Sequence, residues 1–260
     1  MRKRHHIQFP REDLHSLNQD EVFFYLIRGD KRERVRFHDY DKLYSIPGLY
    51  EQLFYDRLKC QSPKKVTQIL KSALVQSTES LSELRVLDLG AGNGMMGEAL
   101  VQEHGLSRLV GVDIIPEAAE ATERDRPGLY DEYYVTDFCS LAPALREEIA
   151  SWQLDCMTSV AALGFGDIPT KAFLEAFNII RSQGWVAFNI KETFLDVSDQ
   201  TGFSRAIREL ILSEYLDIYH MERYTHRLSM EGEPLAYFAI AGRKNADIPD
   251  GFLEGLGVEM

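Results

Sequence analysis

The sequence predicts an α/β fold, in which a doubly wound, mostly parallel sheet of seven strands ends in an antiparallel hairpin and carries an N-terminal helical cover. An apolar strand pattern at 84–89 runs directly into a glycine-rich turn and then into a helical pattern. Strand and helix patterns alternate after that turn, which indicates βαβ units and a parallel sheet. The last two strand patterns are joined only by a turn, which indicates an antiparallel pair.

The N-terminal segment 1–61 is expected to cover the α/β domain. Residues 21–28 are apolar and aromatic, and their periodicity does not decide between a helix and a strand. The charge run at 31–36 is expected to be a solvated connection. A dense aromatic segment follows, which Pro47 and Gly48 divide into two short helices. Its ring side chains are Phe37, His38, Tyr40, Tyr44, Tyr50, Phe54 and Tyr55.

The α/β domain is expected to span 62–244, and its elements follow from apolar periodicity and from helix start and stop signals. Ser62 is predicted to cap the first helix, because a serine followed by Pro63 is a favourable helix start. Strands are predicted at 84–89, 109–113, 133–136, 154–160, 185–190, 216–228 and 235–241. Helices after the glycine turn are predicted at 95–104, 116–124, 144–152, 170–181 and 202–213. The tail 245–260 is expected to be irregular.

Composition and charge describe an ordinary globular chain that is poorly suited to nucleic acid. Of the 260 residues, 45% are hydrophobic and 27% are charged. The formal net charge is −12, and because residues 1–40 hold nine Lys or Arg and seven Asp or Glu, the acidity lies in the rest of the chain. Such an acidic body would repel a phosphate backbone, so a nucleic-acid substrate is not expected.

Several features favour a cytoplasmic location. The three cysteines, Cys60, Cys139 and Cys156, are odd in number and widely spaced, which favours a reducing compartment over a disulfide framework or a metal site. No apolar h-region follows the basic start of the chain, so no secretory signal is expected. No apolar run approaches the ~20 residues that span a bilayer.

The glycine-rich turn is the strongest functional signal in the chain. It reads Asp88-Leu89-Gly90-Ala91-Gly92-Asn93-Gly94. Glycines let the backbone bend tightly and let a ligand lie against it, and the helix that follows would direct unpaired N–H groups at an anionic part of that ligand. A dinucleotide fingerprint needs a third glycine where Met95 stands. The pattern acidic-x-Gly-x-Gly-x-Gly instead resembles the first motif of the class I S-adenosylmethionine (SAM)-dependent methyltransferases, and the resemblance extends over roughly 84–242, terminal hairpin included.

This resemblance implies cofactor residues at the carboxyl ends of the strands. Asp113 matches the second family motif, where an acid accepts both ribose hydroxyl hydrogens, although NAD enzymes also place an acid there. Asp137 and Phe138 match the position at which the family recognises adenine, with a helix-capping carboxylate as the alternative for Asp137. In the family, the acid at Asp88 orients the turn and can contact the methionine ammonium. The implied cofactor-binding set is Asp88, Gly90, Ala91, Gly92, Gly94, Asp113, Ile114, Asp137 and Phe138.

The acceptor side is predicted only from position in the chain. The loop 161–169 faces the transferable methyl group in the family, and here it does not match the Asn-Pro-Pro-Tyr motif of enzymes that methylate amino groups in DNA and protein. The substrate-binding candidates are Tyr40, Tyr44, Ala161, Leu163 and Phe165, and the candidates for a base or a cation are His38, Asp167, Lys191 and Glu192.

The chemistry of the acceptor stays open at this point. A hydroxyl or amine acceptor would use a base such as His38, Glu192 or Asp167. A carboxylate acceptor would need no base, and a cation such as Lys191 or Arg227 would hold it. His226 and Arg227 lie in the predicted hairpin, where a solvated or hydrogen-bonded strand residue is the more common role.

Together these observations predict a SAM-dependent methyltransferase that acts on a small-molecule acceptor by in-line displacement, without a metal. Two alternatives remain. A non-catalytic SAM-binding or interaction protein could keep the same cofactor motifs. An NAD(P)-dependent oxidoreductase is disfavoured by Met95 and by the pair Asp137 and Phe138. The acceptor, its nucleophilic atom and the oligomeric state are not determined by the sequence.

Overall fold

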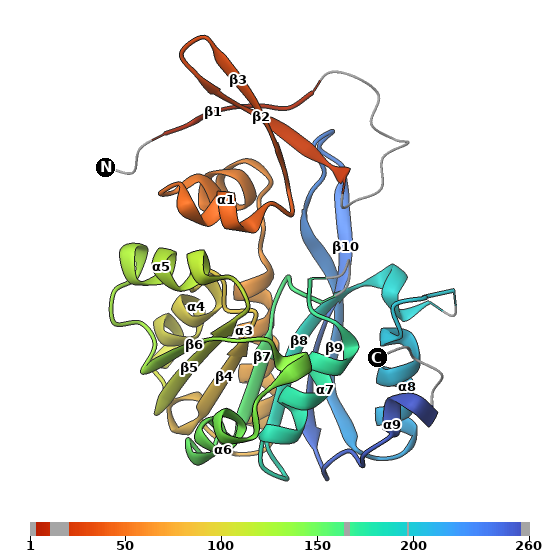
Figure 1. Cartoon of the computed structure of the whole chain (residues 1–260). Helices are drawn as coiled ribbons and strands as arrows, with labels where there is room; N and C mark the ends of the chain where they lie inside the picture. Colours follow the sequence, from red (N-terminus) through yellow and green to blue (C-terminus); the bar gives the residue numbers. More distant parts are fainter. Residues whose placement is uncertain (1–3, 11–20, 164–166, 197, 256–260) are drawn as a thin grey trace.

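The central sheet joins seven strands in the order β6-β5-β4-β7-β8-β10-β9 (Figure 1). The computed structural model describes residues 4–10, 21–163, 167–196 and 198–255. Strands β4 to β8 run parallel, whereas β10 pairs antiparallel with both β8 and β9. The strands are β4 (Arg85–Leu89), β5 (Arg108–Asp113), β6 (Glu132–Val135), β7 (Cys156–Ser159), β8 (Trp185–Lys191), β9 (Leu216–Leu228) and β10 (Pro234–Lys244). This confirms the predicted sheet and its terminal hairpin.

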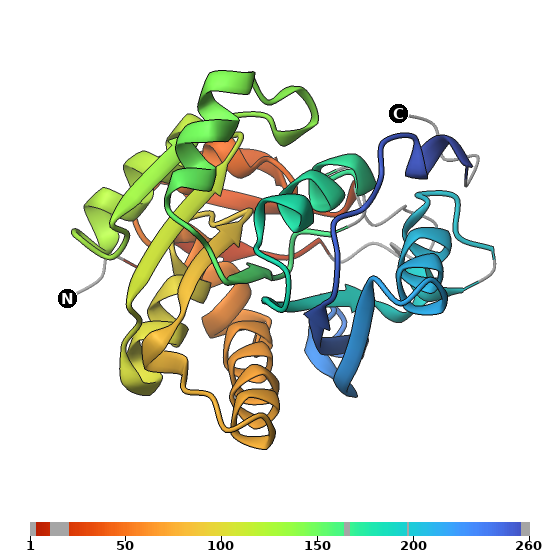
Figure 2. The same cartoon turned by 90° about the horizontal axis from the view of Figure 1, so that it is seen from below.

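Helices cover both faces of the sheet (Figure 2). On one face lie α3 (Ser62–Gln76) and α4 (Met95–His104), and on the other lie α6 (Pro143–Ser151), α7 (Thr170–Ile179) and α8 (Phe203–Leu212). Along β4, Val86 packs in the α3 layer and Leu87 in the α7 layer, because successive side chains of a strand point to opposite faces. Burial on both faces explains why β4 reads as a continuous apolar run.

The remaining elements are shorter or peripheral. Helix α5 (Pro116–Asp125) lies beside the N-terminal segment. The short helices η3 (Leu81–Glu83), η4 (Phe138–Ser140), η5 (Glu192–Leu195) and α9 (Phe252–Gly255) complete the described chain. The tail is therefore not wholly irregular, because α9 forms one turn in which the Phe252 ring packs 5.9 Å from that of Tyr215.

The N-terminal cover contains a small sheet as well as helices (Figure 1). Strands β1 (His6–Gln8), β2 (Phe23–Arg28) and β3 (Lys31–Arg36) form an antiparallel sheet of three, and α1 (Tyr40–Ser45), α2 (Leu49–Glu51) and η2 (Gln52–Arg57) follow. The predicted break at Pro47 and Gly48 between two short helices is confirmed. The cover has an apolar core of its own, which includes Phe24, Phe37 and Leu53.

The charge run at 31–36 is mostly exposed to solvent, as expected, but it forms a strand, so its interpretation as a connection is wrong. A tight turn at Gly29 and Asp30 folds it back on β2. Val35 points into the cover and is fully buried, whereas Arg32 and Arg34 lie on the outer face. Their guanidinium carbons stand 3.5 and 4.0 Å from ring centroids of β2, which is cation–π distance. The exposed guanidinium groups therefore also stack on aromatic rings of the neighbouring strand.

The prediction that Ser62 caps helix α3 is also wrong. Ser62 is already helical, and the preceding Gln61 makes no capping hydrogen bond through its side chain. The Ser62 hydroxyl is fully buried and instead contacts the Tyr224 hydroxyl at 2.6 Å and His226 Nδ1 at 2.5 Å. The Ser62 hydroxyl therefore forms hydrogen bonds with side chains of β9, whereas the local pattern predicted a hydrogen bond to the start of its own helix.

The hairpin of β9 and β10 rises from the sheet to the cover (Figure 1). The backbone N–H of Leu228 donates to the carbonyl of Leu58 at 2.7 Å, and that of Gln61 donates to the carbonyl of His226 at 3.0 Å. Met230, at the hairpin turn, packs against the core of the cover. The hairpin therefore supports the cover above the carboxyl ends of the parallel strands.

Candidate active site

The glycine-rich turn between β4 and α4 forms the floor of the site. The backbone N–H groups of Gly90 and Ala91 both donate to the carbonyl of Val112 at 2.9 Å, which ties the turn to β5. A Cβ at Gly90 would lie 2.7 Å from Ile168 Cδ1, and one at Gly92 would lie 2.5 Å from the Tyr44 hydroxyl oxygen. Both residues also have positive φ, so only glycine meets the steric and conformational demands of this turn.

A cavity of about 310 Å³ lies over this turn, at the carboxyl ends of β4, β5, β6 and β7 and under the cover. The point where β4 and β7 neighbour each other is the topological switch point of the sheet, where ligands of doubly wound folds bind. Among the lining residues are Gly90, Ala91, Gly92, Asp113, Ile114, Asp137, Phe138, Ala161 and Asp167 from the domain and His38, Tyr40, Tyr44, Tyr50 and Tyr55 from the cover.

Asp113 holds the turn and also lines the cavity. Its Oδ2 accepts from the N–H of Gly92 at 2.9 Å and its Oδ1 from the N–H of Ile115 at 3.0 Å. Burial raises the pKa of this carboxyl, and the hydrogen bonds from Ile115 and Gly92 oppose the shift. A carboxylate offers about four lone-pair sites, so two remain after these bonds for a ligand.

Asp137 and Phe138 line the cavity from the end of β6. Asp137 Oδ1 accepts from the N–H of Cys139 at 2.8 Å and Oδ2 from the hydroxyl of Ser140 at 2.9 Å. These bonds, with that from Cys139 the largest cause, lower the pKa of Asp137. The helix-capping role considered for Asp137 is therefore present in the structure, next to the cavity. Phe138 is 3% exposed and packs in the core.

Two of the nine predicted cofactor residues, Asp88 and Gly94, lie outside the lining of this cavity. Asp88 is 1% exposed, and its carboxylate accepts from the Tyr130 hydroxyl at 2.7 Å and the Thr158 hydroxyl at 2.8 Å. Burial raises its pKa to about 6, although these two hydrogen bonds lower it. Asp88 shares a face of β4 with Val86, so its side chain points into the helix-covered layer rather than beyond the strand end. At Gly94 a Cβ would meet Leu129 Cδ2 at 2.8 Å, in the packed protein.

The fold brings two predicted base candidates together in the cavity. His38 Nδ1 lies 3.0 Å from Asp167 Oδ1, and the Tyr40 hydroxyl donates to Asp167 Oδ2 at 3.4 Å. The side chains of His38 and Asp167 are 17% and 22% exposed, which is consistent with the edge of a cavity. An imidazole that is held by a carboxylate can accept a proton from a ligand.

Other predicted acceptor residues lie elsewhere. Glu192 pairs with Arg223 at 2.8 Å on the exposed side of the sheet, and neither Glu192 nor Lys191 lines the cavity. Leu163 is 3% exposed and packs in the α7 layer, because a bridge to Ile168 turns it inward. Phe165 lies outside the described residues. Tyr40, Tyr44 and Ala161 do line the cavity.

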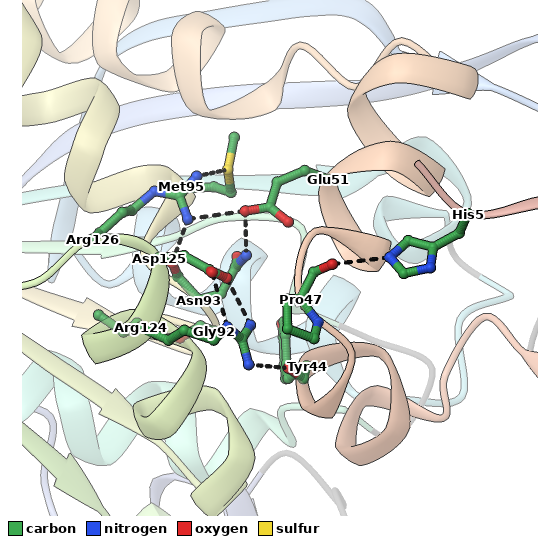
Figure 3. Close-up of polar contacts among 11 residues, drawn as sticks. His5, Tyr44, Pro47, Glu51, Gly92, Asn93, Met95, Arg124, Asp125 and Arg126 are labelled. Atoms are coloured by element: carbon green, nitrogen blue, oxygen red, sulfur yellow. Dashed lines mark hydrogen bonds and ion pairs between the residues drawn. The ribbon is translucent and has the colours of Figure 1, made fainter. Parts of the chain in front are cut away.

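A polar junction that the sequence did not indicate joins the cover to the turn (Figure 3). Glu51 Oε1, from α2, accepts from Asn93 Nδ2 at 2.9 Å and from Arg126 Nη1 at 3.1 Å. Arg126 also donates to the Asn93 carbonyl at 2.9 Å and pairs with Glu98 at 3.2 Å. The residues come from four separate segments, and no local pattern distinguishes them.

A second network holds the loop after β7. Ala161 has φ of 58°, and its N–H donates to Asn189 Oδ1 at 2.7 Å. Asn189 Nδ2 in turn donates to the Tyr224 hydroxyl at 2.8 Å and to Ser62 Oγ at 3.1 Å. The buried side-chain amide of Asn189 therefore holds Ala161, at the wall of the cavity, in a positive-φ conformation that is unfavourable for a residue with a β-carbon.

Two further properties concern the described part of the chain as a whole. It contains no helix with the length and apolar character needed to cross a membrane. Within the same residues, no three His, Cys, Asp or Glu side chains gather in a way that could hold a metal ion.

The chain matches known proteins over its α/β part. Residues 87–188 match the family described as "Methyltransferase domain". The mitochondrial ubiquinone biosynthesis O-methyltransferase of Candida albicans is 28% identical over 108 residues, which are 40% of this chain and 32% of that protein. The match thus spans about a third of the length of this curated relative.

Solved structures share the fold at low identity. A putative RNA methyltransferase from Pyrococcus horikoshii is 14% identical, with a TM-score of 0.51 over 72% of this chain and 83% of that chain. A magnesium protoporphyrin IX methyltransferase from Synechocystis with bound SAM is also 14% identical, with a TM-score of 0.49 over 70% and 79% of the two chains. Residues 87–188 thus match a methyltransferase domain family, and the α/β part of the chain has a fold similar to that of class I, SAM-dependent methyltransferases.

Proposed function

We propose that this chain transfers a methyl group from SAM to a small-molecule acceptor. The supporting observation is that one cavity is lined both by the glycine turn with Asp113 and by the pair His38 and Asp167. Its volume of about 310 Å³ and its cover of tyrosine rings suit a small ligand better than a polymer. The acidic body of the chain further disfavours a nucleic-acid acceptor.

The cavity suits SAM in its donors and acceptors. Asp113 has lone pairs that are not used by its backbone hydrogen bonds, and these would accept hydrogen bonds from the ribose hydroxyls. Asp137 and Phe138 would contact the adenine. The absence of Cβ atoms at Gly90 and Gly92 lets the cofactor approach the backbone. When bound, SAM supplies a methyl group on a sulfonium, which is a good leaving group for in-line displacement.

The remaining catalytic work falls to the chain's own residues. His38 would accept the proton of an acceptor hydroxyl or amine, while Asp167 accepts from Nδ1 and thereby leaves Nε2 as the basic nitrogen. Such base catalysis contributes about 10²–10⁴-fold. Alignment of the acceptor under the cover would supply about 7–11 kcal/mol of the barrier.

The proposal extends to the division of the chain and its location. Segment 1–61 acts as the cover, 62–244 as the SAM-binding domain and 245–260 as a tail, with the hairpin of β9 and β10 as the support between the first two. Cys60, Cys139 and Cys156 are all free thiols, which supports work in a reducing compartment such as the cytoplasm.

Calorimetry with S-adenosylhomocysteine (SAH), the demethylated product of SAM, and with NAD tests the cofactor assignment. We expect SAH to bind, NAD not to bind, and Asp113→Ala with Asp137→Ala to weaken SAH by at least about 100-fold, because each lost charged hydrogen bond costs about 1.5–3 kcal/mol. Glu120→Ala with Glu123→Ala, which removes two exposed carboxylates of α5, is the matched control. Tight NAD binding without an SAH response would overturn the assignment.

Labelled SAM then tests transfer. With fractions of a metabolite extract, label should move to small molecules. Label that moves only to protein or RNA contradicts the acceptor class, and no transfer at all contradicts the activity.

A further inference from the structure

Three neighbouring strand ends set the direction in which the proposed cofactor lies. The sheet places β6, β5 and β4 side by side, with Asp137 after β6, Asp113 at the end of β5 and the glycine turn after β4. A SAM molecule with its adenine at Asp137 and its ribose at Asp113 therefore brings its amino-acid end to the glycine turn. That end carries an ammonium group, which needs hydrogen-bond acceptors when it leaves water.

Asn93 is the polar side chain that the turn itself presents to the cavity. Asp88, the acid that the family resemblance assigns to the ammonium, lies outside the cavity lining, and its carboxylate accepts two hydrogen bonds in the helix-covered layer. Asn93, which no motif singled out, lines the cavity and is 2% exposed. An amide oxygen there can do what Asp88 cannot reach to do.

Two hydrogen bonds fix the orientation of Asn93 (Figure 3). Its side-chain Nδ2 donates to Glu51 Oε1 at 2.9 Å, and its backbone carbonyl accepts from Arg126 Nη1 at 2.9 Å. Because a carboxylate only accepts hydrogen bonds, the NH₂ end of the amide is the end that faces Glu51. The side-chain oxygen Oδ1 is therefore directed away from Glu51, with lone pairs for a cation.

The charge around Asn93 also favours a cation. Arg126 faces two carboxylates, those of Glu51 and Glu98, so negative charge is in excess at this junction. Glu51 is 4% exposed, and its Oε2 is buried without a hydrogen-bond partner within the described residues. Excess negative charge that is removed from water attracts an ammonium more strongly than it would at the surface.

The orientation of the Asn93 side chain depends on the cover, whereas the backbone of the turn does not. The carbonyl of Gly92 accepts from Thr122 Oγ1 at 2.9 Å and from the Tyr133 hydroxyl at 2.7 Å, both within the α/β domain. Glu51, in contrast, comes from α2 of the cover. Docking of the cover therefore decides where the Asn93 amide points.

We propose that the side-chain oxygen of Asn93 accepts a hydrogen bond from the ammonium of SAM, and that Glu51 is the positioning residue that turns Asn93 toward it. Recognition of the amino-acid end is then complete only when the cover is docked on the turn. By linkage, a bound cofactor favours the docked cover. This inference rests on the cofactor assignment of the proposed function, and it is independent of the methyl acceptor.

SAH and 5′-methylthioadenosine test the contact, because the second ligand has the adenosine and sulfur of SAH but no amino acid. Calorimetry on the full chain should show that SAH binds at least about tenfold more tightly, as expected for one hydrogen bond to a charged group. Asn93→Ala should remove about tenfold of SAH affinity and change 5′-methylthioadenosine less than about twofold. Alanine suits the backbone there, because Asn93 does not have positive φ.

Two variants of Glu51 test positioning. Glu51→Ala removes the acceptor of Asn93 Nδ2, so it should weaken SAH and leave 5′-methylthioadenosine nearly unchanged. Glu51→Gln keeps a carbonyl oxygen for Asn93, so it should retain most of the SAH affinity even where loss of the charge pair with Arg126 lowers the unfolding temperature. Affinity and stability thus respond differently to the same position.

Arg124→Met is the matched control for docking of the cover. Arg124 Nη1 donates to the carbonyl of Tyr44 in the cover at 3.0 Å, and the other bonds of its guanidinium go to Asp125 (Figure 3). This variant removes a hydrogen bond between cover and domain without touching Asn93. The ratio of the two affinities should therefore stay as it is in the unmodified protein.

The outcomes separate this contact from the cofactor assignment. Equal binding of both ligands to the unmodified protein, or a ratio that Asn93→Ala leaves unchanged, overturns the contact alone. If Glu51→Ala weakens both ligands alike, or Glu51→Gln loses as much SAH affinity as Glu51→Ala, the positioning role is overturned. Should Asn93→Ala not fold, Glu51→Ala and the two ligands on the unmodified protein decide. A protein that binds neither ligand overturns the cofactor assignment, and this inference with it.

Discussion

His38 and Asp167 lie 129 positions apart in the chain, yet His38 Nδ1 stands 3.0 Å from Asp167 Oδ1 at the edge of the cavity. The histidine comes from the cover and the aspartate from the loop after β7. The pair therefore exists only when the cover is closed over the sheet. Such a base would be assembled together with the enclosed space in which water is excluded.

The first prediction concerns this pair. His38→Asn removes the base, so we expect kcat to fall about 10²–10⁴-fold while SAH affinity stays within a factor of two. Asp167→Asn should also lower kcat, because the tautomer of His38 is no longer fixed. Steady-state kinetics and calorimetry on the same preparations measure both quantities. A His38→Asn enzyme with an unchanged kcat would remove His38 from the mechanism.

The second prediction concerns the contact of Tyr44 with the turn. Gly92→Ala places a Cβ 2.5 Å from the Tyr44 hydroxyl oxygen, at a residue with φ of 55°. The positive φ alone costs about 1–3 kcal/mol. Chemical denaturation of Gly92→Ala should show a loss of unfolding free energy larger than this conformational cost. The double variant Gly92→Ala with Tyr44→Phe should recover only the part of the loss that is due to the steric contact. If Tyr44→Phe recovers nothing, the hydroxyl is not what limits the space over Gly92.

The third prediction concerns the buried junction of Glu51 and Arg126. Arg126→Met leaves the Glu51 carboxylate buried without its cation, so we expect the free energy of unfolding to fall by about 3–5 kcal/mol. Lys71→Met, which breaks the half-exposed pair with Glu103, should cost no more than about 1 kcal/mol. Urea unfolding of both variants provides the comparison. Equal losses would show that burial of the junction does not matter.

The fourth prediction concerns pH and Asp88. Its pKa is about 6 in the folded protein and 3.8 in the unfolded chain, so between these values the folded state holds the extra proton. Ionisation then favours unfolding, and stability from this group is present below pH ~4 and lost as the pH rises to ~6, by about 3 kcal/mol in total.

Asp88→Asn isolates this effect because it cannot ionise. The difference in unfolding free energy between Asp88→Asn and the unmodified protein should shift in favour of the variant by about 2.4 kcal/mol from pH 4 to pH 7. Denaturant titrations at several pH values measure it. A difference that stays constant over this range would mean that Asp88 titrates normally.

The elements with local signals were predicted closely. The helix predicted at 95–104 is α4 (Met95–His104), because its start follows a glycine turn and its apolar face repeats at helical spacing. The hairpin of β9 and β10 likewise follows from two strand patterns with a turn between them. Asp113 and Asp137 could be placed at the site because carboxyl ends of parallel strands meet at one edge of a sheet.

Elsewhere the local pattern misled. The charged residues of β3 were expected to form a connection, yet they pair with β2 along the whole strand, and Arg32 and Arg34 stack on its rings. Leu163 follows a strand just as Ala161 does, yet it points into the core. In both cases the deciding contacts are backbone pairings with residues nearby in the chain, which a pattern of charge or hydrophobicity does not reveal.

The sequence by itself determined the order of strands and helices, the glycine turn and the acidic strand ends, because backbone propensity and apolar periodicity act over a few residues. Only the tertiary structure decided that His38 meets Asp167, that Glu51 meets Arg126, and that Arg227 is buried without a carboxylate among the described residues. Those pairings depend on how the cover and the hairpin pack over the sheet, and packing depends on the shape of the whole chain.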